Sequence, residues 1–190
     1  AHLGLYVVRV YKNGTWMTVL VDDRIPCHTK DTTPPSTRKE GDPIFAKCKD
    51  ENEFWVMIIE KAYAKVHHCY ENLNDGEIDY GLRDLTGGVP DELDLSSKAI
   101  QTIAQNGSLW TMLQSMKKSG HTVLLGTAIV VQGAPVEGEA GEGLMDNHAY
   151  SILQFQILEE EKTTLLQLRN PWGKGEWTGD WSDKWEGWDS

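Results

Sequence analysis

Two runs near the start of the chain, Leu5–Lys12 and Thr15–Asp22, show alternation of their side chains, in Tyr6, Val8 and Val10 and then in Trp16, Thr18 and Leu20. Alternation at every second position is the pattern of a half-buried β-strand. The two runs are separated by Asn13-Gly14, a residue pair that favours a two-residue hairpin turn. We therefore predict a β-hairpin over residues 5–22.

A helical pattern follows between Asp50 and Cys69. Apolar residues recur there at helical spacing and form one stripe, namely Phe54, Ile58, Ala62, Val66 and Cys69. Asp50 is the predicted N-cap, with Glu53 as its capping-box partner. Further helices are expected over Ser108–Lys118 and, shorter, around Lys98–Gln105.

Three other stretches are expected to connect these elements. Pro26–Gly41 is a polar surface loop, and Gly81–Asp91 contains Thr-Gly-Gly-Val-Pro, which breaks regular structure and predicts a hinge. Thr122–Gln132 is predicted to be a buried strand. Gly133–Gly143 is a glycine-rich, acidic and mobile loop that leads towards His148. It is either a substrate gate or an ordinary surface loop.

A second hairpin is predicted near the end of the chain. The apolar runs Ala149–Leu158 and Thr163–Leu168 flank the acidic cluster Glu159–Glu161. A hairpin symmetric about Glu159 sets Ser151 opposite Gln167, Ile152 opposite Leu166, and His148 opposite Asn170. Directly opposed Cβ atoms on one face lie about 4.5–5.5 Å apart, so the imidazole and the carboxamide are expected to be neighbours.

This pair has a chemical use in the cysteine form of the nucleophile–base–orienter triad. His148 would take the thiol proton, and the Asn170 carbonyl would accept from the other ring nitrogen. Trp172 would cover that hydrogen bond. In the alternative interpretation, His148 is an ordinary hairpin residue and Asn-Pro-Trp-Gly is only a turn. A one-residue bulge would also direct His148 to the other face of the hairpin.

Composition restricts the classes of function. The 190 residues are 39% hydrophobic and 25% charged, as in an ordinary globular protein, and no apolar run is long enough to span a membrane. A formal net charge of −11 argues against nucleic acid as a partner. The three cysteines, Cys27, Cys48 and Cys69, form no CxxC and are odd in number. They favour free thiols in a reducing compartment.

Several motifs together resemble the calpain family of cysteine proteases, within the papain-like clan. Near the end of the chain these are His148-Ala-Tyr-Ser, Arg169-Asn-Pro-Trp-Gly and Glu176-Trp-Thr-Gly with Trp181-Ser-Asp. The earlier motifs, in the order of the family, are Val21-Asp-Asp-Arg-Ile-Pro, Asn52-Glu-Phe-Trp with Glu60-Lys-Ala-Tyr-Ala-Lys, and Leu85-Thr-Gly-Gly. The resemblance covers nearly the whole chain.

The resemblance implies an α+β, papain-like, two-lobed protease core, with a partial helical lobe and an antiparallel β lobe. Residues 1–86 would be the C-terminal part of the first core subdomain, 87–90 the hinge, and 91–190 the second subdomain, truncated at its C-terminus. It also implies a Cys-His-Asn endopeptidase with His148 and Asn170 as catalytic residues and Trp172 as support.

The family's nucleophile lies in an upstream segment of the type Gln-Gly-x-x-Gly-Asp-Cys-Trp, which these 190 residues lack. We therefore expect the nucleophile to come from outside the chain and the chain alone to be inactive. The alternative is a catalytically inactive calpain-like scaffold or regulatory binding module. The expected partners are protein substrates, the missing nucleophile-bearing part of the core and accessory domains, in an intracellular, cytoplasmic setting.

Calcium regulation is the last implication of the resemblance. Glu53 matches a family ligand in the first lobe, and Glu176 and Asp183 match two ligands in the second. Because Ca²⁺ takes about 6–8 oxygen ligands, both sites are expected to be incomplete in this chain. The alternative is that Glu53 only caps a helix and that Glu176 and Asp183 are plain surface carboxylates.

Overall fold

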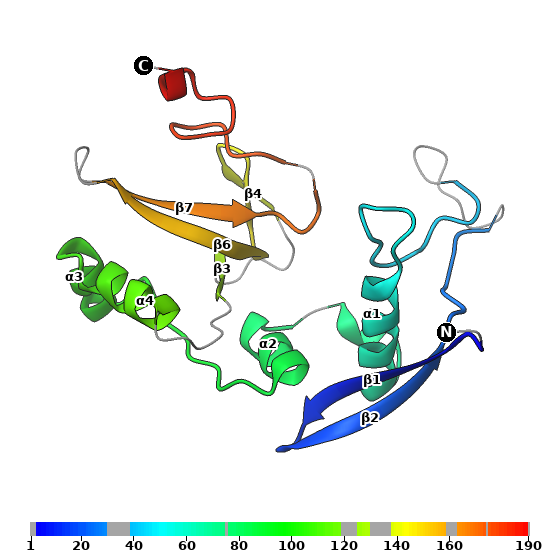
Figure 1. The fold of residues 1–190 in the computed structure, drawn as a ribbon. Coiled ribbons are helices and arrows are strands. Elements are labelled where there is room, and N and C mark those ends of the chain that lie inside the picture. The colour runs from blue at the N-terminus through cyan, green and yellow to red at the C-terminus, as the bar shows by residue number, and fades with distance from the viewer. Residues whose placement is uncertain are drawn as a thin grey trace. The chain divides into compact units, whose positions relative to one another are not determined.

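The computed structural model of the chain describes residues 3–29, 39–74, 76–118, 125–129, 138–158, 163–173 and 175–189. The backbone forms two compact units, Ala1–Asp91 and Glu92–Ser190. The expected hinge, 87–90, lies at the end of the first unit. Helices combine with antiparallel sheets, which is the expected α+β class (Figure 1).

The first unit consists of a β-hairpin and helices. Its elements are β1 (Leu5–Lys12), β2 (Thr15–Asp22), α1 (Trp55–Val66), the 3-10 turn η1 (Glu71–Leu73) and α2 (Ile78–Thr86). β1 and β2 pair antiparallel from Leu5 opposite Asp22 to Lys12 opposite Thr15. Asn13 and Gly14 both have positive φ, 52° and 79°, as a two-residue turn of this kind requires. The predicted first hairpin is confirmed.

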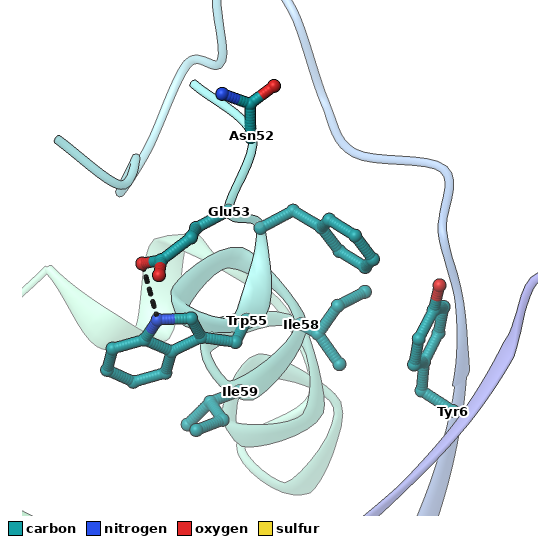
Figure 2. A pocket seen from close by; sticks show the side chains of 7 residues that line it. Tyr6, Asn52, Glu53, Trp55, Ile58 and Ile59 are labelled. Atoms are coloured by element: carbon teal, nitrogen blue, oxygen red, sulfur yellow. Dashed lines mark hydrogen bonds between the residues drawn. The ribbon is translucent and has the colours of Figure 1, made fainter. Parts of the chain in front are cut away.

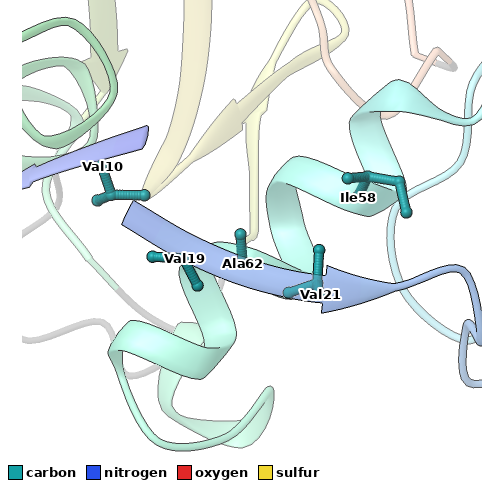
Figure 3. Close-up of a cluster of buried hydrophobic side chains, with 5 residues drawn as sticks. All are labelled: Val10, Val19, Val21, Ile58 and Ala62. Carbon is teal, nitrogen blue, oxygen red and sulfur yellow. The ribbon is translucent and has the colours of Figure 1, made fainter. Parts of the chain in front are cut away.

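One face of this hairpin packs on α1. Val10 from β1, Val19 and Val21 from β2, and Ile58 and Ala62 from α1 form the buried cluster of this unit (Figure 3). Ile58 and Ala62 are four residues apart and lie on the apolar stripe expected from the sequence. On β1 the predicted alternation includes the buried Val10. On β2 the buried residues are Val19 and Val21, and the predicted Trp16, Thr18 and Leu20 are exposed, so the alternation expected there was wrong.

The predicted start of α1 was wrong. The helix begins at Trp55, five residues after Asp50, and its N-cap Phe54 makes no side-chain capping bond. The Asp50 carboxylate instead accepts the backbone N–H of Asn52 at 2.9 Å, and the Asp50 carbonyl accepts the N–H of Glu53 at 3.1 Å. A short aspartate side chain that bonds two residues ahead closes a turn and competes with the helix. The helix also ends at Val66, before Cys69.

Helix α2 was not expected, because Gly81–Asp91 was interpreted as a hinge on account of its Thr-Gly-Gly-Val-Pro stretch. Asp84 explains why the helix forms here, since its carboxylate is 0% exposed. It accepts hydrogen bonds from the Lys12 ammonium, from the Tyr63 hydroxyl at 3.1 Å, and from Nε and Nη2 of Arg83 at 3.2 Å each. These bonds attach α2 to β1 and α1. The helix ends at Thr86, and its C-cap Gly87 has a left-handed φ of 71°.

The expected surface loop over Pro26–Gly41 has ordered ends. Cys27 forms an isolated bridge with Pro43, and the N–H of His28 donates to the Asp42 carbonyl at 2.8 Å. Residues 30–38 lie outside the described part of the chain. The two described ends of the loop thus run side by side.

The second unit contains two helices, a three-stranded sheet and a small hairpin. Its elements are α3 (Lys98–Gln105), α4 (Ser108–Lys118), β3 (Leu125–Ile129), β4 (Gly138–Gly141), β5 (Leu144–Asp146), β6 (His148–Leu158), β7 (Thr163–Arg169) and the 3-10 turn η2 (Glu186–Asp189). Both helices agree with the predicted ranges. Over the described residues, no helix is long and apolar enough to cross a membrane.

The central strand of the larger sheet is β6, which pairs antiparallel with β3 on one side and β7 on the other (Figure 1). β3 lies within the strand predicted for Thr122–Gln132, whose remaining residues are outside the described part of the chain. The predicted loop Gly133–Gly143 needs a correction. Its described residues include β4, which pairs with β5, and residues 133–137 are not described.

The predicted register of β6 with β7 was also wrong. Ser151 pairs with Arg169 and Ile152 with Leu168, each two residues further along than expected. The last described pair of this ladder is Leu158 with Thr163. A bulge between Ile152 and Gln154 then changes the register once more.

Candidate active site

His148 is the first residue of the central strand β6. Its backbone pairs with Ile129 of β3, and Asn147 before it has a left-handed φ of 51°. The His148 residue is only 4% exposed. Asparagine adopts this backbone conformation more readily than most residues. The imidazole of His148 is thus placed at the first residue of strand β6.

Asn170 follows the last residue of β7, and its carboxamide meets the imidazole of His148. Nε2 of His148 lies 2.8 Å from Oδ1 of Asn170, and the same oxygen accepts the backbone N–H of Trp172 at 3.0 Å. A backbone N–H can only donate, so this bond identifies the carboxamide oxygen. Nε2 of His148 must then carry the proton, which leaves the lone pair of the neutral ring on Nδ1.

Two aromatic rings pack against this imidazole. The Trp172 ring centroid lies 4.5 Å from that of His148 with an interplanar angle of 51°, although Trp172 is 47% exposed. The ring of the buried Tyr150 meets the imidazole edge-on, at 5.0 Å and 89°. The expected neighbours are thus together, despite the wrong register. Asn170 reaches His148 from just beyond the end of β7, and not as its strand partner.

Sequence reasoning missed Asn147 and Tyr150 as neighbours of this pair. Tyr150 lies two residues after His148, so strand alternation places both side chains on one face. The Tyr150 hydroxyl also accepts the N–H of Met145 at 2.8 Å. Asn147 was the signal that the sequence offered, because asparagine adopts a left-handed backbone more readily than most residues.

The second unit contains no cysteine. Cys27, Cys48 and Cys69 all belong to the first unit, where they are partly buried and unpaired with one another. The Cys27 thiol donates to the Ile25 carbonyl at 3.3 Å. The described part of the second unit therefore brings an imidazole and a carboxamide together without a thiol beside them.

The acidic side chains do not by themselves fit a calcium ion. Glu53, Glu176 and Asp183 are all exposed, and Oε2 of Glu53 accepts the indole N–H of Trp55 at 3.2 Å (Figure 2). Glu53 borders an open hollow of about 340 Å³ whose lining is mostly apolar: Tyr6, Asn52, Phe54, Trp55, Ile58 and Ile59. Among the described residues, no three His, Cys, Asp or Glu side chains gather where they would hold a metal ion.

Comparison with known families identifies the family of the chain. A sequence profile described as "Calpain family cysteine protease" matches residues 1–190. The chain belongs to the calpain family.

Similar calpains occur in plants and animals. The calpain-type cysteine protease ADL1 of Oryza sativa subsp. japonica is 41% identical over 189 residues, which are 97% of this chain and 8% of the rice protein. Calpain-12 of Homo sapiens is 35% identical over 191 residues, covering 100% of this chain and 24% of the human protein. Calpain-A of Drosophila melanogaster is 32% identical over 189 residues, 96% of this chain and 20% of that protein. The chain thus spans a quarter or less of these calpains.

Proposed function

We propose that this chain is part of a calpain-like cysteine endopeptidase, in which His148 is the general base and Asn170 orients it. The observation that carries the proposal is the 2.8 Å contact of His148 Nε2 with Asn170 Oδ1, in a carboxamide whose orientation the Trp172 N–H identifies. Family membership supports the reaction class. The nucleophilic cysteine belongs to an upstream segment outside these 190 residues.

The tautomer defines the direction of proton transfer. The thiolate sulfur attacks the carbonyl carbon of the scissile peptide bond, and His148 delivers the former thiol proton from Nδ1 to the departing amine nitrogen. Water then attacks the thioester carbon and gives a proton to His148. The carboxylic acid product leaves, the proton returns to sulfur, and the thiol is restored.

The two neighbours have supporting roles in this scheme. The Asn170 oxygen accepts from Nε2 throughout, and it stabilises the imidazolium more than the neutral ring because bonds to charged groups are stronger. The Trp172 ring lies on the imidazole and limits the access of water to that bond. Neither residue gains or loses a proton.

Calcium regulation and an intracellular, cytoplasmic location are further parts of the proposal. Calcium rests on family membership alone, with Glu53, Glu176 and Asp183 as partial ligands whose remaining oxygens come from elsewhere. The three unpaired cysteines support a reducing compartment. Protein substrates, the missing nucleophile-bearing part of the core and accessory domains are the proposed partners.

The test uses the full-length protein that contains this chain. Asn170→Ala should lower kcat about 10–100-fold, because a hydrogen bond to a charged group contributes about 1.5–3 kcal/mol. KM should stay within about twofold, since the substitution changes the orientation of the proposed base and no group assigned to substrate binding. Asn74→Ala, at an exposed site in the first unit, is the matched control. Equal effects on kcat and KM, or no effect, would refute the role of Asn170.

The nucleophile is identified separately. An epoxide reagent that alkylates activated thiols should label one cysteine upstream of Ala1, and His148→Ala should suppress the labelling. Labelling of Cys27, Cys48 or Cys69 would overturn this assignment. A full-length protein that neither reacts nor cleaves any peptide would instead be a calpain-like scaffold.

A further inference from the structure

The β4–β5 hairpin leads directly into His148, and its turn packs on the loop that follows Asn170. The turn residues Glu142 and Gly143 have positive φ, 50° and 85°. The Glu142 carbonyl accepts the N–H of Thr178 at 2.9 Å. A Cβ added to Gly143 would overlap the backbone carbonyl of Glu176. The turn therefore lies so close to this loop that only glycine fits at position 143.

This contact lies next to the carboxamide of the proposed orienting residue. A Cβ placed on Gly175 would lie 3.7 Å from Nδ2 of Asn170 and 3.9 Å from the Gly143 carbonyl oxygen. Asn170, Gly175 and Gly143 are thus consecutive neighbours in space. The backbone at Gly175 therefore lies between the turn of the hairpin and the Asn170 carboxamide.

The other end of the hairpin is attached to β6. The N–H of Met145, in β5, donates to the Tyr150 hydroxyl at 2.8 Å, and the Tyr150 ring meets His148 edge-on. Only Asp146 and Asn147 separate Met145 from His148. The hairpin is consequently bonded on one side to the strand that carries the base and on the other to the loop that follows the orienting amide.

We propose that the β4–β5 hairpin holds the His148–Asn170 pair in register, and that Gly143 is a positioning residue. The two side chains come from separate segments, yet their bond is 2.8 Å long. A displacement of about 1 Å at such a pair costs on the order of 100-fold in rate. The catalytic consequence rests on the proposed function, whereas the structural consequence does not.

The test compares two alanine substitutions with the same backbone strain. Gly143→Ala introduces a left-handed alanine and a collision with Glu176. Gly107→Ala, at a φ of 82° between α3 and α4, introduces the left-handed alanine into open space. The 190-residue chain, labelled with ¹⁵N at histidine, reports whether His148 keeps its Nε2-bound proton. Wild type and Gly107→Ala should show this tautomer with slow proton exchange, and Gly143→Ala should lose it.

Tyr150→Phe is the second variant, and it removes the acceptor of the Met145 N–H while retaining the ring. It should accelerate exchange of the His148 Nε2 proton without unfolding the chain. If Gly143→Ala does not fold, Tyr150→Phe decides the question. An unchanged His148 signal in a folded Gly143→Ala variant, or in Tyr150→Phe when the first does not fold, would overturn the proposal.

The kinetic readout separates positioning from general stability. In the full-length protein, Gly143→Ala should lower kcat on the order of 10–100-fold with KM within about twofold, and Gly107→Ala should leave both unchanged. If the wild-type protein has no peptidase activity, the proposed function fails. The histidine signals of the two glycine variants still decide the role of the hairpin in that case.

Discussion

The buried carboxylate of Asp84 should be the most sensitive single group in the first unit. Asp84→Asn keeps the size and shape of the side chain and removes its charge. Oδ2 accepts from Lys12 and Tyr63 and Oδ1 accepts from Arg83, so the NH₂ group that replaces either oxygen leaves at least one of these donors without its acceptor. Removing one partner of a buried ion pair costs about 3–5 kcal/mol. Lys12 and Arg83 are 24% and 34% exposed and can regain water, so we expect about 2–4 kcal/mol.

This loss is large enough to measure by thermal unfolding. For a unit of this size, each 1 kcal/mol lowers Tm by about 4–8 °C, so the transition of the first unit should fall by at least about 8 °C. Far-ultraviolet circular dichroism of the 190-residue chain follows it at pH 7. Asp91→Asn makes the same change of charge at an exposed position and should shift stability by less than about 0.5 kcal/mol. Equal effects of the two variants would refute the reasoning.

The pH dependence provides an independent check. Burial alone would raise the pKa of Asp84, but hydrogen bonds from Lys12, Tyr63 and Arg83 outweigh it and lower the pKa below 3.8. The ionised carboxylate therefore stabilises the folded state above the ordinary carboxyl pKa. That contribution is lost as pH falls through the lowered value. The gap between wild type and Asp84→Asn should be full above about pH 5 and shrink below about pH 4.

Three further outcomes follow from the same structure. Burial and the nearby Asp84 charge raise the pKa of Tyr63 to about 12 from 10.0. Wild-type stability should therefore fall between about pH 10 and 12, and Tyr63→Phe should weaken that fall in urea titrations. Gly87→Ala should cost about 2–3 kcal/mol in urea unfolding, because φ is 71° and the new Cβ would lie 2.8 Å from Trp16, whereas Gly76→Ala, in open space, should cost under about 1 kcal/mol. Micromolar Ca²⁺ should shift the Tm of the 190-residue chain by less than about 2 °C, since a weakly occupied site adds little; calorimetry showing many degrees would disprove the incomplete-site argument.

Local signals in the sequence were sufficient for several elements. Asn13-Gly14 specifies its turn because both residues tolerate positive φ, and helix α4 extends over the predicted range Ser108–Lys118. The pairing of an imidazole with a carboxamide was also predictable, since His148 and Asn170 lie at matching ends of two β-prone runs. The turn and the helix depend on neighbours in the chain, and the His148–Asn170 pair depends on the hairpin pattern of two consecutive strands.

Long-range contacts decided the rest. Helix α2 contains Gly81, which disfavours a helix, and it is bonded to β1 and α1 through Asp84, whose partners Lys12 and Tyr63 are distant in sequence. The register of β6 with β7 includes a bulge between Ile152 and Gln154, which alternation alone does not specify. The close packing of Gly143 on Glu176 likewise has no local signature. The sequence by itself determined which side chains could form the site, and tertiary structure determined how they meet, because ion pairs, register and backbone contacts join residues that no local pattern connects.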